Sequence, residues 1–226
     1  MKKSKRFKEI EKQINPTKSY PVDEAVDLVK KTSTIKFDAS VELHIRSGID
    51  AKKSDQQIRG SVILPHGTGK KQIIAAFVED DKIKEAQKTG ADIIGDEEII
   101  AKIKQTGKVN FGIAIATPGM MKKLASAAKI LGPKGLMPSP KDGTVTPNVG
   151  KAIEELKKGK ISFKNDDAGN LHIMIGKVSF DNNKLKENLE AVMEAVNKAK
   201  PSGIKGTYIK NAVLTSSMGP GIKLSI

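Results

Sequence analysis

The sequence predicts a protein of mixed class, in which an α+β domain built from both ends of the chain is interrupted by an inserted α/β domain. Residues 1–67 and 160–226 share strands that alternate strictly between apolar and polar side chains, which is typical of a sheet with one open face. Residues 68–159 instead hold short, wholly apolar runs between helical segments, which is typical of a parallel sheet covered on both faces. The two crossings, near Gly67-Thr68-Gly69 and Gly159-Lys160, predict a hinge of two adjacent strands.

The first segment opens with two predicted helices. Residues 4–14 form a charged helix that ends at Asn15-Pro16, and an amphipathic helix follows Tyr20 and closes at Lys30-Lys31. The next strand, residues 37–46, points Val41, Leu43 and Ile45 to one side. Its other side carries Ser40, Glu42, His44 and Arg46. A second strand covers residues 57–64.

The middle segment follows a β-α-β-α-β order. Its apolar runs predict strands at residues 73–78, 91–95 and 111–116. The intervening and following segments predict four helices, at residues 81–88, 96–105, 118–128 and 149–158. A loop rich in glycine and proline, residues 131–147, separates the last two helices.

The last segment returns to the alternating pattern. Residues 171–175 form a strand, residues 184–200 form a helix with Asp181 or Asn183 as its N-cap, and residues 206–215 form a final strand. The stretch Thr215–Lys223 then turns at Gly-Pro-Gly, which holds two hydroxyls and a thioether at the end of a rigid element. Such a turn either closes the sheet or presents these groups to sugar and phosphate.

Basic residues exceed acidic ones throughout the chain. The 226 residues include 40 Lys and Arg against 26 Asp and Glu, a net charge of +14. Residues 1–67, 68–159 and 160–226 carry +5, +5 and +4, so no tail holds the charge. Only three of the basic residues are Arg, and lysine-rich surfaces bind phosphate as point charges. The composition therefore predicts a polyanionic partner, nucleic acid rather than a small acidic metabolite.

Several classes of site are absent from the sequence. Cysteine is missing, which excludes disulfides and thiolate zinc sites and predicts a cytoplasmic location. No apolar run approaches the roughly 20 residues of a membrane span, so we expect a soluble protein with no membrane partner. His44, His66 and His172 are scattered, and no nucleophile motif appears, so no metal site, cofactor or catalytic residue is expected.

Two glycine motifs resemble ligand loops without matching them. Residues 67–71 (Gly-Thr-Gly-Lys-Lys) lack the first glycine and the final Ser or Thr of a phosphate loop, and indicate a basic hinge instead. Residues 132–135 (Gly-Pro-Lys-Gly) match the glycine clamp of a single-strand RNA-binding domain, but Pro133 removes a backbone donor that such a clamp uses.

The polar side of the alternating strands is the strongest candidate for a binding surface. Ser40, Glu42, His44 and Arg46 on one strand and His172 on another would adjoin Ser216-Ser217-Met218 if both ends share a sheet. Phe37 beside Lys36 suits stacking on a base, and Glu42 can accept from a 2′-hydroxyl or base amino group, which favours RNA over DNA. The alternative is a solvated sheet face without a ligand.

Motifs along nearly the whole chain resemble the bacterial large-subunit ribosomal protein L-one family. The resemblance rests on Phe37–Glu42 (FDASVE), Asp55–Gly60 (DQQIRG), Leu64–Lys70 (LPHGTGK), Ile130–Pro138 (ILGPKGLMP), Gly176–Phe180 (GKVSF) and Ser216–Gly221 (SSMGPG). It implies a split two-layer α+β domain, residues 1–67 and 160–226, and an inserted three-layer Rossmann-like domain, residues 68–159. It also implies a structural, non-enzymatic role on the ribosome for a protein that we expect to be a monomer when free.

The resemblance further implies three RNA partners. They are 23S rRNA at the mobile stalk beside the tRNA exit site, deacylated tRNA leaving that site, and the messenger of the protein's own operon, whose translation it represses. The resemblance and the polar strand side together indicate a set of RNA-contacting residues. They are Lys36, Phe37, Ser40, Glu42, Arg46, Lys164, His172, Ser216, Ser217, Met218 and Gly219.

The sequence departs from the family pattern at a few positions. Ser40 and Ser217 stand where threonine is usual, which keeps the hydroxyl. Asp167 stands where lysine is usual, so Lys164 is the only contact that we carry over to this loop. Met174 stands where proline is usual, a change that the sequence does not explain. The alternative function is a nucleotide- or sugar-phosphate-dependent enzyme using the inserted domain, because such sheets bind ligands at their carboxyl ends.

Overall fold

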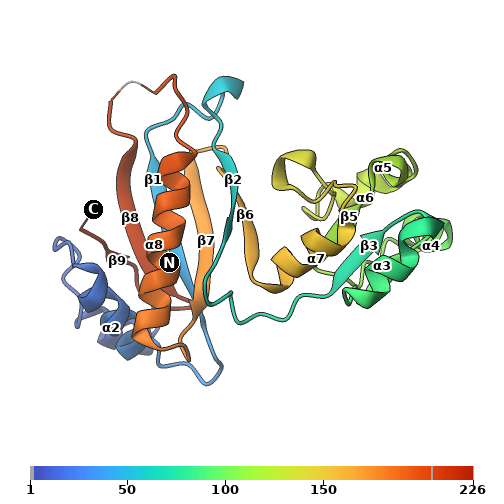
Figure 1. Cartoon of the computed structure of the whole chain (residues 1–226). Helices are drawn as coiled ribbons and strands as arrows, with labels where there is room; N and C mark the ends of the chain where they lie inside the picture. Colours follow the sequence, from blue (N-terminus) through green and yellow to red (C-terminus); the bar gives the residue numbers. More distant parts are fainter. Residues whose placement is uncertain (1–2, 205, 226) are drawn as a thin grey trace. The chain divides into compact units, whose positions relative to one another are not determined.

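The computed structural model describes residues 3–204 and 206–225 and confirms the mixed α and β class. The chain forms two compact units (Figure 1). Unit 1 contains the residues up to Gly69 and those from Gly159 onward, and unit 2 contains Lys70–Lys158.

An antiparallel four-stranded sheet forms the centre of unit 1. Its strands are β1 (Ser40–Ser47), β7 (Asn170–Lys177), β8 (Ile209–Ser216) and β9 (Ile222–Lys223), in the order β7-β1-β8-β9. β1 therefore has both edges paired by strands from the far end of the chain. Its alternation is as predicted, since Val41, Leu43 and Ile45 are fully buried.

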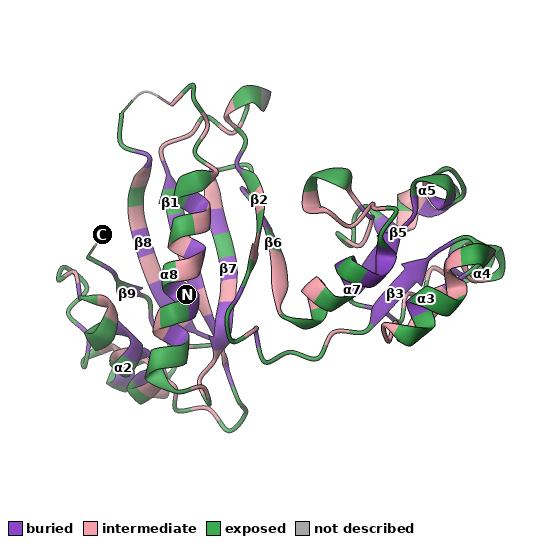
Figure 2. Cartoon of the chain, viewed as in Figure 1, coloured by how far each residue is buried: buried purple, intermediate pink, exposed green. Residues whose placement is uncertain are grey.

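Helices cover one face of this sheet. α2 (Val22–Thr32) and α8 (Asn182–Lys198) pack their apolar stripes on the strands, in one core that includes Val26, Leu189 and Val192. Buried and exposed segments alternate along α8 in Figure 2, as expected for a helix with one side on a sheet. A shorter helix, α1 (Lys5–Glu11), begins at Ser4, whose hydroxyl accepts from the Phe7 N–H.

A two-stranded antiparallel sheet completes unit 1. β2 (Arg59–Ile63) pairs with β6 (Lys160–Lys164), a strand that the sequence did not predict. A 3-10 turn, η1 (Ser54–Gln56), precedes β2. Gly60 faces the Phe163 ring so closely that a β-carbon on it would come within 2.8 Å of that ring. The ring therefore fills the space that a side chain at Gly60 would need.

The chain leaves and re-enters unit 1 at adjacent points. A β-carbon on Gly159 would lie 2.5 Å from the Gly67 α-carbon, and both glycines have positive φ, 99° and 61°. The Leu64 N–H donates to the Gly159 carbonyl over 3.2 Å. Asn188 on α8 adds a fully buried amide that accepts from the His66 N–H and donates to the carbonyls of Gly67 and Ile175.

Unit 2 is built on a parallel sheet of three strands. β3 (Ile74–Phe77) lies between β4 (Ile93–Gly95) and β5 (Ile113–Ala116). All four β3 residues are buried: Ala75 and Phe77 belong to one core cluster, and Ile74 and Ala76 to another. The first cluster includes residues of α4 (Glu97–Thr106), α5 (Pro118–Leu124) and α6 (Ala128–Leu131); the second includes residues of α3 (Ile83–Lys88) and α7 (Val149–Lys157).

Several element boundaries differ from the prediction. The first helix ends at Glu11, before the Asn15-Pro16 stop. The helix expected over residues 118–128 is instead α5, a 3-10 turn η3 (Ala125–Ala127) and α6. Two further 3-10 turns, η2 (Asp80–Lys82) and η4 (Pro140–Asp142), lie in unit 2. Among the residues that the structure describes, no helix has the length and apolar character needed to cross a membrane.

Candidate nucleic-acid interface

The face of the unit 1 sheet opposite the helices is lined largely by polar side chains. Glu42, His44 and Arg46 alternate with the buried residues of β1 and remain partly or fully exposed. The strand register sets side chains of β7 and β8 beside them: Glu42 lies between Met174 and Thr215, His44 between His172 and Val213, and Arg46 between Asn170 and Asn211. We call these nine residues the polar face.

A tight turn follows β8 at one end of the polar face. The Gly219 N–H donates to the Ser216 carbonyl over 2.8 Å, which closes a four-residue turn with Met218 at its third position. Met218 has φ of 62° and is the non-glycine residue with positive φ in the described chain. This conformation costs about 1–2 kcal/mol for an L-residue, and Met218 is 70% exposed, so burial does not offset the cost.

Contacts from distant segments hold this turn. The Ser217 N–H donates to the Ser40 carbonyl over 3.0 Å, which joins the turn to the start of β1. Arg6 donates through Nη2 to the Met218 carbonyl over 3.0 Å and through Nη1 to the Thr34 hydroxyl over 3.4 Å. The turn is thus tied to the N-terminal helix as well as to the sheet.

The segment before β1 places a second large apolar side chain at this end of the sheet. Phe37 is 58% exposed, and Lys36 beside it is exposed too. Asp38 fixes the segment by accepting from the Ser179 N–H and hydroxyl, with Lys177 Nζ 3.5 Å away. Burial acts to raise the pKa of Asp38, but the bonds from Ser179 and the charge of Lys177 lower it below its usual value. Asp38 therefore stays ionised and keeps the segment in place.

Two histidines meet at the centre of the polar face. The Nδ1 atoms of His44 and His172 lie 2.7 Å apart. The other ring nitrogen of each faces a carboxylate: His44 Nε2 is 3.7 Å from Glu42, and His172 Nε2 is 3.4 Å from Asp166. Burial, then the neighbouring His172, lowers the pKa of His44, while Glu42 acts in the opposite direction.

Most of the predicted contact residues lie on the polar face or beside it, in the turn after β8 and the segment before β1. Ser40, Glu42, Arg46 and His172 lie along the strands; Lys36 and Phe37 precede β1; Ser217, Met218 and Gly219 form the turn. Lys164 is exposed, but it lies on β6 in the separate two-stranded sheet, opposite Arg59.

Ser216 is not where we expected it. It is 3% exposed and faces the core side of the sheet, so the expectation of a surface hydroxyl is wrong. A β-carbon on Gly219 would lie 2.4 Å from the Ser216 hydroxyl oxygen. The buried Ser216 side chain therefore packs against Gly219 on the core side of the turn. It leaves no room for a side chain at position 219.

Two residues of this region, His44 and Arg6, were missing from the set of predicted RNA contacts. Alternation had placed His44 on the same strand side as Glu42, within the candidate binding surface, but we assigned it no contact. Arg6 gives no local signal, because its contact with Met218 spans 212 positions of sequence.

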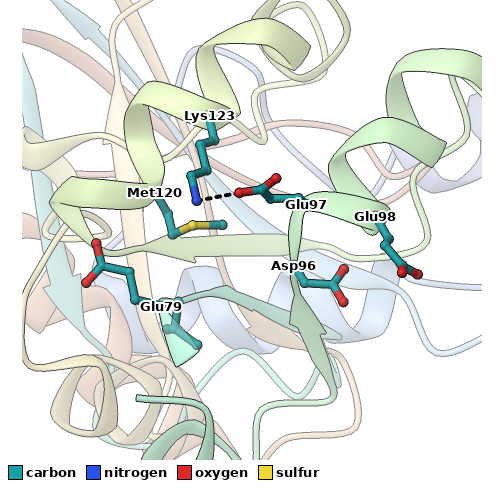
Figure 3. Close-up of a pocket in the computed structure, with 7 residues that line it drawn as sticks. Glu79, Asp96, Glu97, Glu98, Met120 and Lys123 are labelled. Atoms are coloured by element: carbon teal, nitrogen blue, oxygen red, sulfur yellow. Dashed lines mark ion pairs between the residues drawn. The ribbon is translucent and has the colours of Figure 1, made fainter. Parts of the chain in front are cut away.

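Unit 2 contains a separate pocket of about 280 Å³ (Figure 3). Glu79 and Asp96 follow strands β3 and β4, and Glu97 and Glu98 begin α4. Lys123 pairs with Glu97 over 2.5 Å and Met120 supplies an apolar wall. Four carboxylates against one ammonium make this pocket unsuited to a phosphate-bearing ligand. Among the described residues, no group of three or more His, Asp or Glu side chains is placed to hold a metal ion.

Comparison with known proteins identifies similar chains over nearly the full length. A family model described as "Ribosomal protein L1p/L10e family" matches residues 29–220. The chain is 51% identical over 224 residues to "Large ribosomal subunit protein uL1" of Thermosipho melanesiensis, covering 99% of this chain and 97% of the relative. Proteins of the same name from Thermosipho africanus and Fervidobacterium nodosum are each 50% identical, covering 99% and 100% of this chain and 96% of each relative.

Proposed function

The chain belongs to the ribosomal protein L1p/L10e family, and from this premise we propose that it binds 23S rRNA as a structural constituent of the large ribosomal subunit. The family is one of ribosomal proteins rather than of enzymes. The names of the similar proteins place them in the large subunit, which supports the same location for this chain.

The observation that carries the proposal is the exposure of Phe37 and Met218 at one end of the polar face. They are the two most exposed large apolar side chains of the described chain, 58% and 70%. Met218 is also held in an unfavourable backbone conformation, because the Ser217 N–H donates to the Ser40 carbonyl and Arg6 donates to the Met218 carbonyl. Strained, exposed apolar residues that are held in place from several sides are typical of binding surfaces.

The surrounding groups have the chemistry for RNA. Phe37 offers a stacking surface, and Lys36 beside it a charge for phosphate. The Ser40 and Ser217 hydroxyls and the Gly219 backbone supply hydrogen bonds at close approach. Glu42 accepts from a 2′-hydroxyl or base amino group. Arg46 and His172 extend the RNA-binding surface along the polar face, and Lys164 makes a phosphate contact at its periphery. Ser216 is buried, so it contributes only by packing against Gly219.

The proposal assigns the RNA surface to residues 1–67 and 160–226, the RNA-binding domain, and leaves residues 68–159 as an inserted domain. Unit 1 supports this division because the polar face and its turn draw on both ends of the chain. We extend the proposal to two related activities, assistance in the release of deacylated tRNA from the exit site and repression of the protein's own messenger. Both rest on the family resemblance.

Direct binding tests the main proposal. Purified full-length protein should retain 23S rRNA, but not 16S rRNA, in filter-binding assays at physiological salt, and should sediment with large subunits. The competing enzyme hypothesis instead requires a free protein that binds a nucleotide tightly. Equal affinity for both rRNAs would contradict a specific site. The two related activities are tested by tRNA release from ribosomes lacking the protein, and by competition between its own messenger and 23S rRNA.

A further inference from the structure

Two histidines of the polar face are joined by one hydrogen bond between their rings. His44 and His172 are directly opposite in the β1–β7 register, with ring centroids 4.9 Å apart and ring planes at 63°. Their Nδ1 atoms are 2.7 Å apart, so one nitrogen donates and the other accepts. Which ring donates is decided by what the two outer nitrogens face.

Asp166 decides the tautomer of His172. Its carboxylate accepts first from the Asn170 backbone and side chain, and also from the Ala168 N–H and the His172 ring; these bonds lower the pKa of Asp166 to about 2. At neutral pH this carboxylate only accepts, so Nε2 of His172 carries a hydrogen and donates to it. The Nδ1 of a neutral His172 is then the acceptor.

The tautomer of His44 follows. Because Nδ1 of His172 accepts, the shared hydrogen belongs to Nδ1 of His44, and Nε2 of a neutral His44 has a free lone pair. That nitrogen lies 3.7 Å from Oε2 of Glu42, with no hydrogen on either atom. Two acceptors side by side on a partly exposed surface attract a donor that can reach both.

We propose that Glu42 and His44, oriented by His172 and Asp166, form a two-acceptor site that binds a hydrogen-bond donor of RNA, a base amino group or a ribose 2′-hydroxyl. This inference rests on the proposed function. Phosphate oxygens only accept, so the site rejects the phosphate groups of RNA. His44 determines specificity by contact, whereas His172 and Asp166 are positioning residues.

The position of the added proton sets the sign of the pH dependence, and the side chains around the pair are as follows. Arg46 lies two residues along β1, Val213 of β8 lies on the other side of His44, and Lys223 of β9 lies beyond Val213. Acidification adds one proton to the histidine pair. Because the shared bond holds a single hydrogen and Nε2 of His172 already carries one, the added proton leaves a hydrogen on His44 Nε2 whichever ring accepts it, and that hydrogen faces Glu42 and fills the site. RNA affinity is therefore greatest while the pair is neutral and falls as the pair gains this proton. A histidine that bound phosphate as a cation would give the opposite sign.

The tautomers can be measured without RNA. Long-range proton–nitrogen correlation spectra of ¹⁵N-labelled full-length protein at pH 8 should show His44 with its hydrogen on Nδ1 and His172 with its hydrogen on Nε2. His66, which faces Glu187 across 2.6 Å, is an internal reference outside the pair. A hydrogen on Nε2 of His44 would overturn the inference whatever the RNA result.

Binding tests the RNA contact. The probe is the 23S rRNA fragment that the protein protects from nuclease, titrated between pH 8 and 5.5. The wild-type Kd should rise by up to about tenfold per pH unit once the pH is below the midpoint at which the histidine pair gains its proton. His44→Gln, which restores an acceptor, should bind within about threefold of wild type with a flat profile, while His44→Phe should lose about tenfold at pH 8. His66→Phe should match wild type.

Tighter wild-type binding at low pH, or a His44→Phe variant that is folded by circular dichroism and binds normally, would overturn the proposal. Single 2′-deoxynucleotides at the protected positions separate the two donors. If one of them removes the difference between wild type and His44→Phe, the donor is a 2′-hydroxyl; if none does, it is a base amino group. Absence of binding at every pH would instead refute the proposed function, while the tautomers still test the histidine pair.

Discussion

The guanidinium of Arg6 donates a 3.0 Å hydrogen bond to the carbonyl oxygen of Met218, 212 positions away in the sequence. The bond joins the first helix to the turn after β8, where Met218 adopts a left-handed conformation. With the Ser217–Ser40 bond, it holds Met218 from two directions. The exposed thioether therefore stands on a fixed backbone.

Relief of the strain at Met218 should separate stability from binding. Met218→Gly should raise the free energy of unfolding by up to about 1 kcal/mol, since glycine removes the left-handed penalty but adds unfolded-state entropy. The same change should weaken RNA binding, because the apolar tip is lost. Met218→Ala is the matched control: it loses the tip and keeps the strain, so its stability should not rise. Urea unfolding and filter binding measure both quantities.

Phe37 should matter for RNA and not for folding. Phe37→Ala should weaken the free energy of RNA binding by about 1–3 kcal/mol, roughly 5- to 150-fold in Kd, the range for removal of an aromatic stack on a base. Because the ring is 58% exposed, the unfolding midpoint should barely move. Ile63→Ala, at a 46% exposed apolar residue on β2, is the control and should leave affinity unchanged. Equal losses in both variants would mean that the surface is misplaced.

The inserted domain should be dispensable for most RNA affinity. Replacement of residues 70–158 by a short glycine linker should keep affinity within about threefold of wild type and reduce its salt dependence slightly. The adjacent positions of Gly67 and Gly159 allow such a short join. A folded variant that loses most of its affinity would refute the assignment of RNA binding to unit 1.

Asn188 should be a large contributor to the stability of unit 1. Asn188→Ala removes three hydrogen bonds and leaves the Gly67 and Ile175 carbonyls without that donor, which should cost about 2–4 kcal/mol. Asn183→Ala, at an exposed position of the same helix, should change stability little. The comparison is made by urea unfolding; similar values for both would show that the buried amide is not needed.

Asp166 should make the free energy of unfolding depend on pH in the acid range. Its pKa is lowered from 3.8 to about 2, so its stabilising effect is present above the unfolded-state pKa and is lost as pH falls through about 2. Unfolding of wild type and Asp166→Asn from pH 6 to 2 should therefore show their stabilities converging below pH 4. A constant difference across that range would contradict this assignment of the carboxylate.

Local patterns predicted the elements with strong periodicity. The β1 alternation and the α8 stripe placed Val41, Leu43, Leu185 and Val192 correctly in the core. β6 and β9 were missed because KISFK is short with charged ends and β9 has only two residues. Such strands exist because a neighbouring edge is available, and that information is non-local.

The candidate site was predictable in its residue types but not in its pairings. Glu42 and His172 followed from alternation, but the contact of His44 with His172 depends on the β1–β7 register, which includes a bulge between Val41 and Glu42. Ser216 was misjudged although Ala212 and Leu214 alternate toward it, because the turn-like composition of residues 215–221 hid the last step of β8. Met174 proves to lie beside Glu42, so its departure from the family pattern falls on the polar face.

The central place of β1 in its sheet delays its pairing until most of the chain has been synthesised. Both of its edges are paired by β7 and β8, which the ribosome synthesises later. At about 5–20 residues per second, roughly 6–25 s separate the synthesis of β1 from that of β7. During that interval the nascent chain carries an unpaired, half-apolar strand, which is a site for aggregation. The topology therefore favours any factor that covers residues 40–47 until β7 has been synthesised.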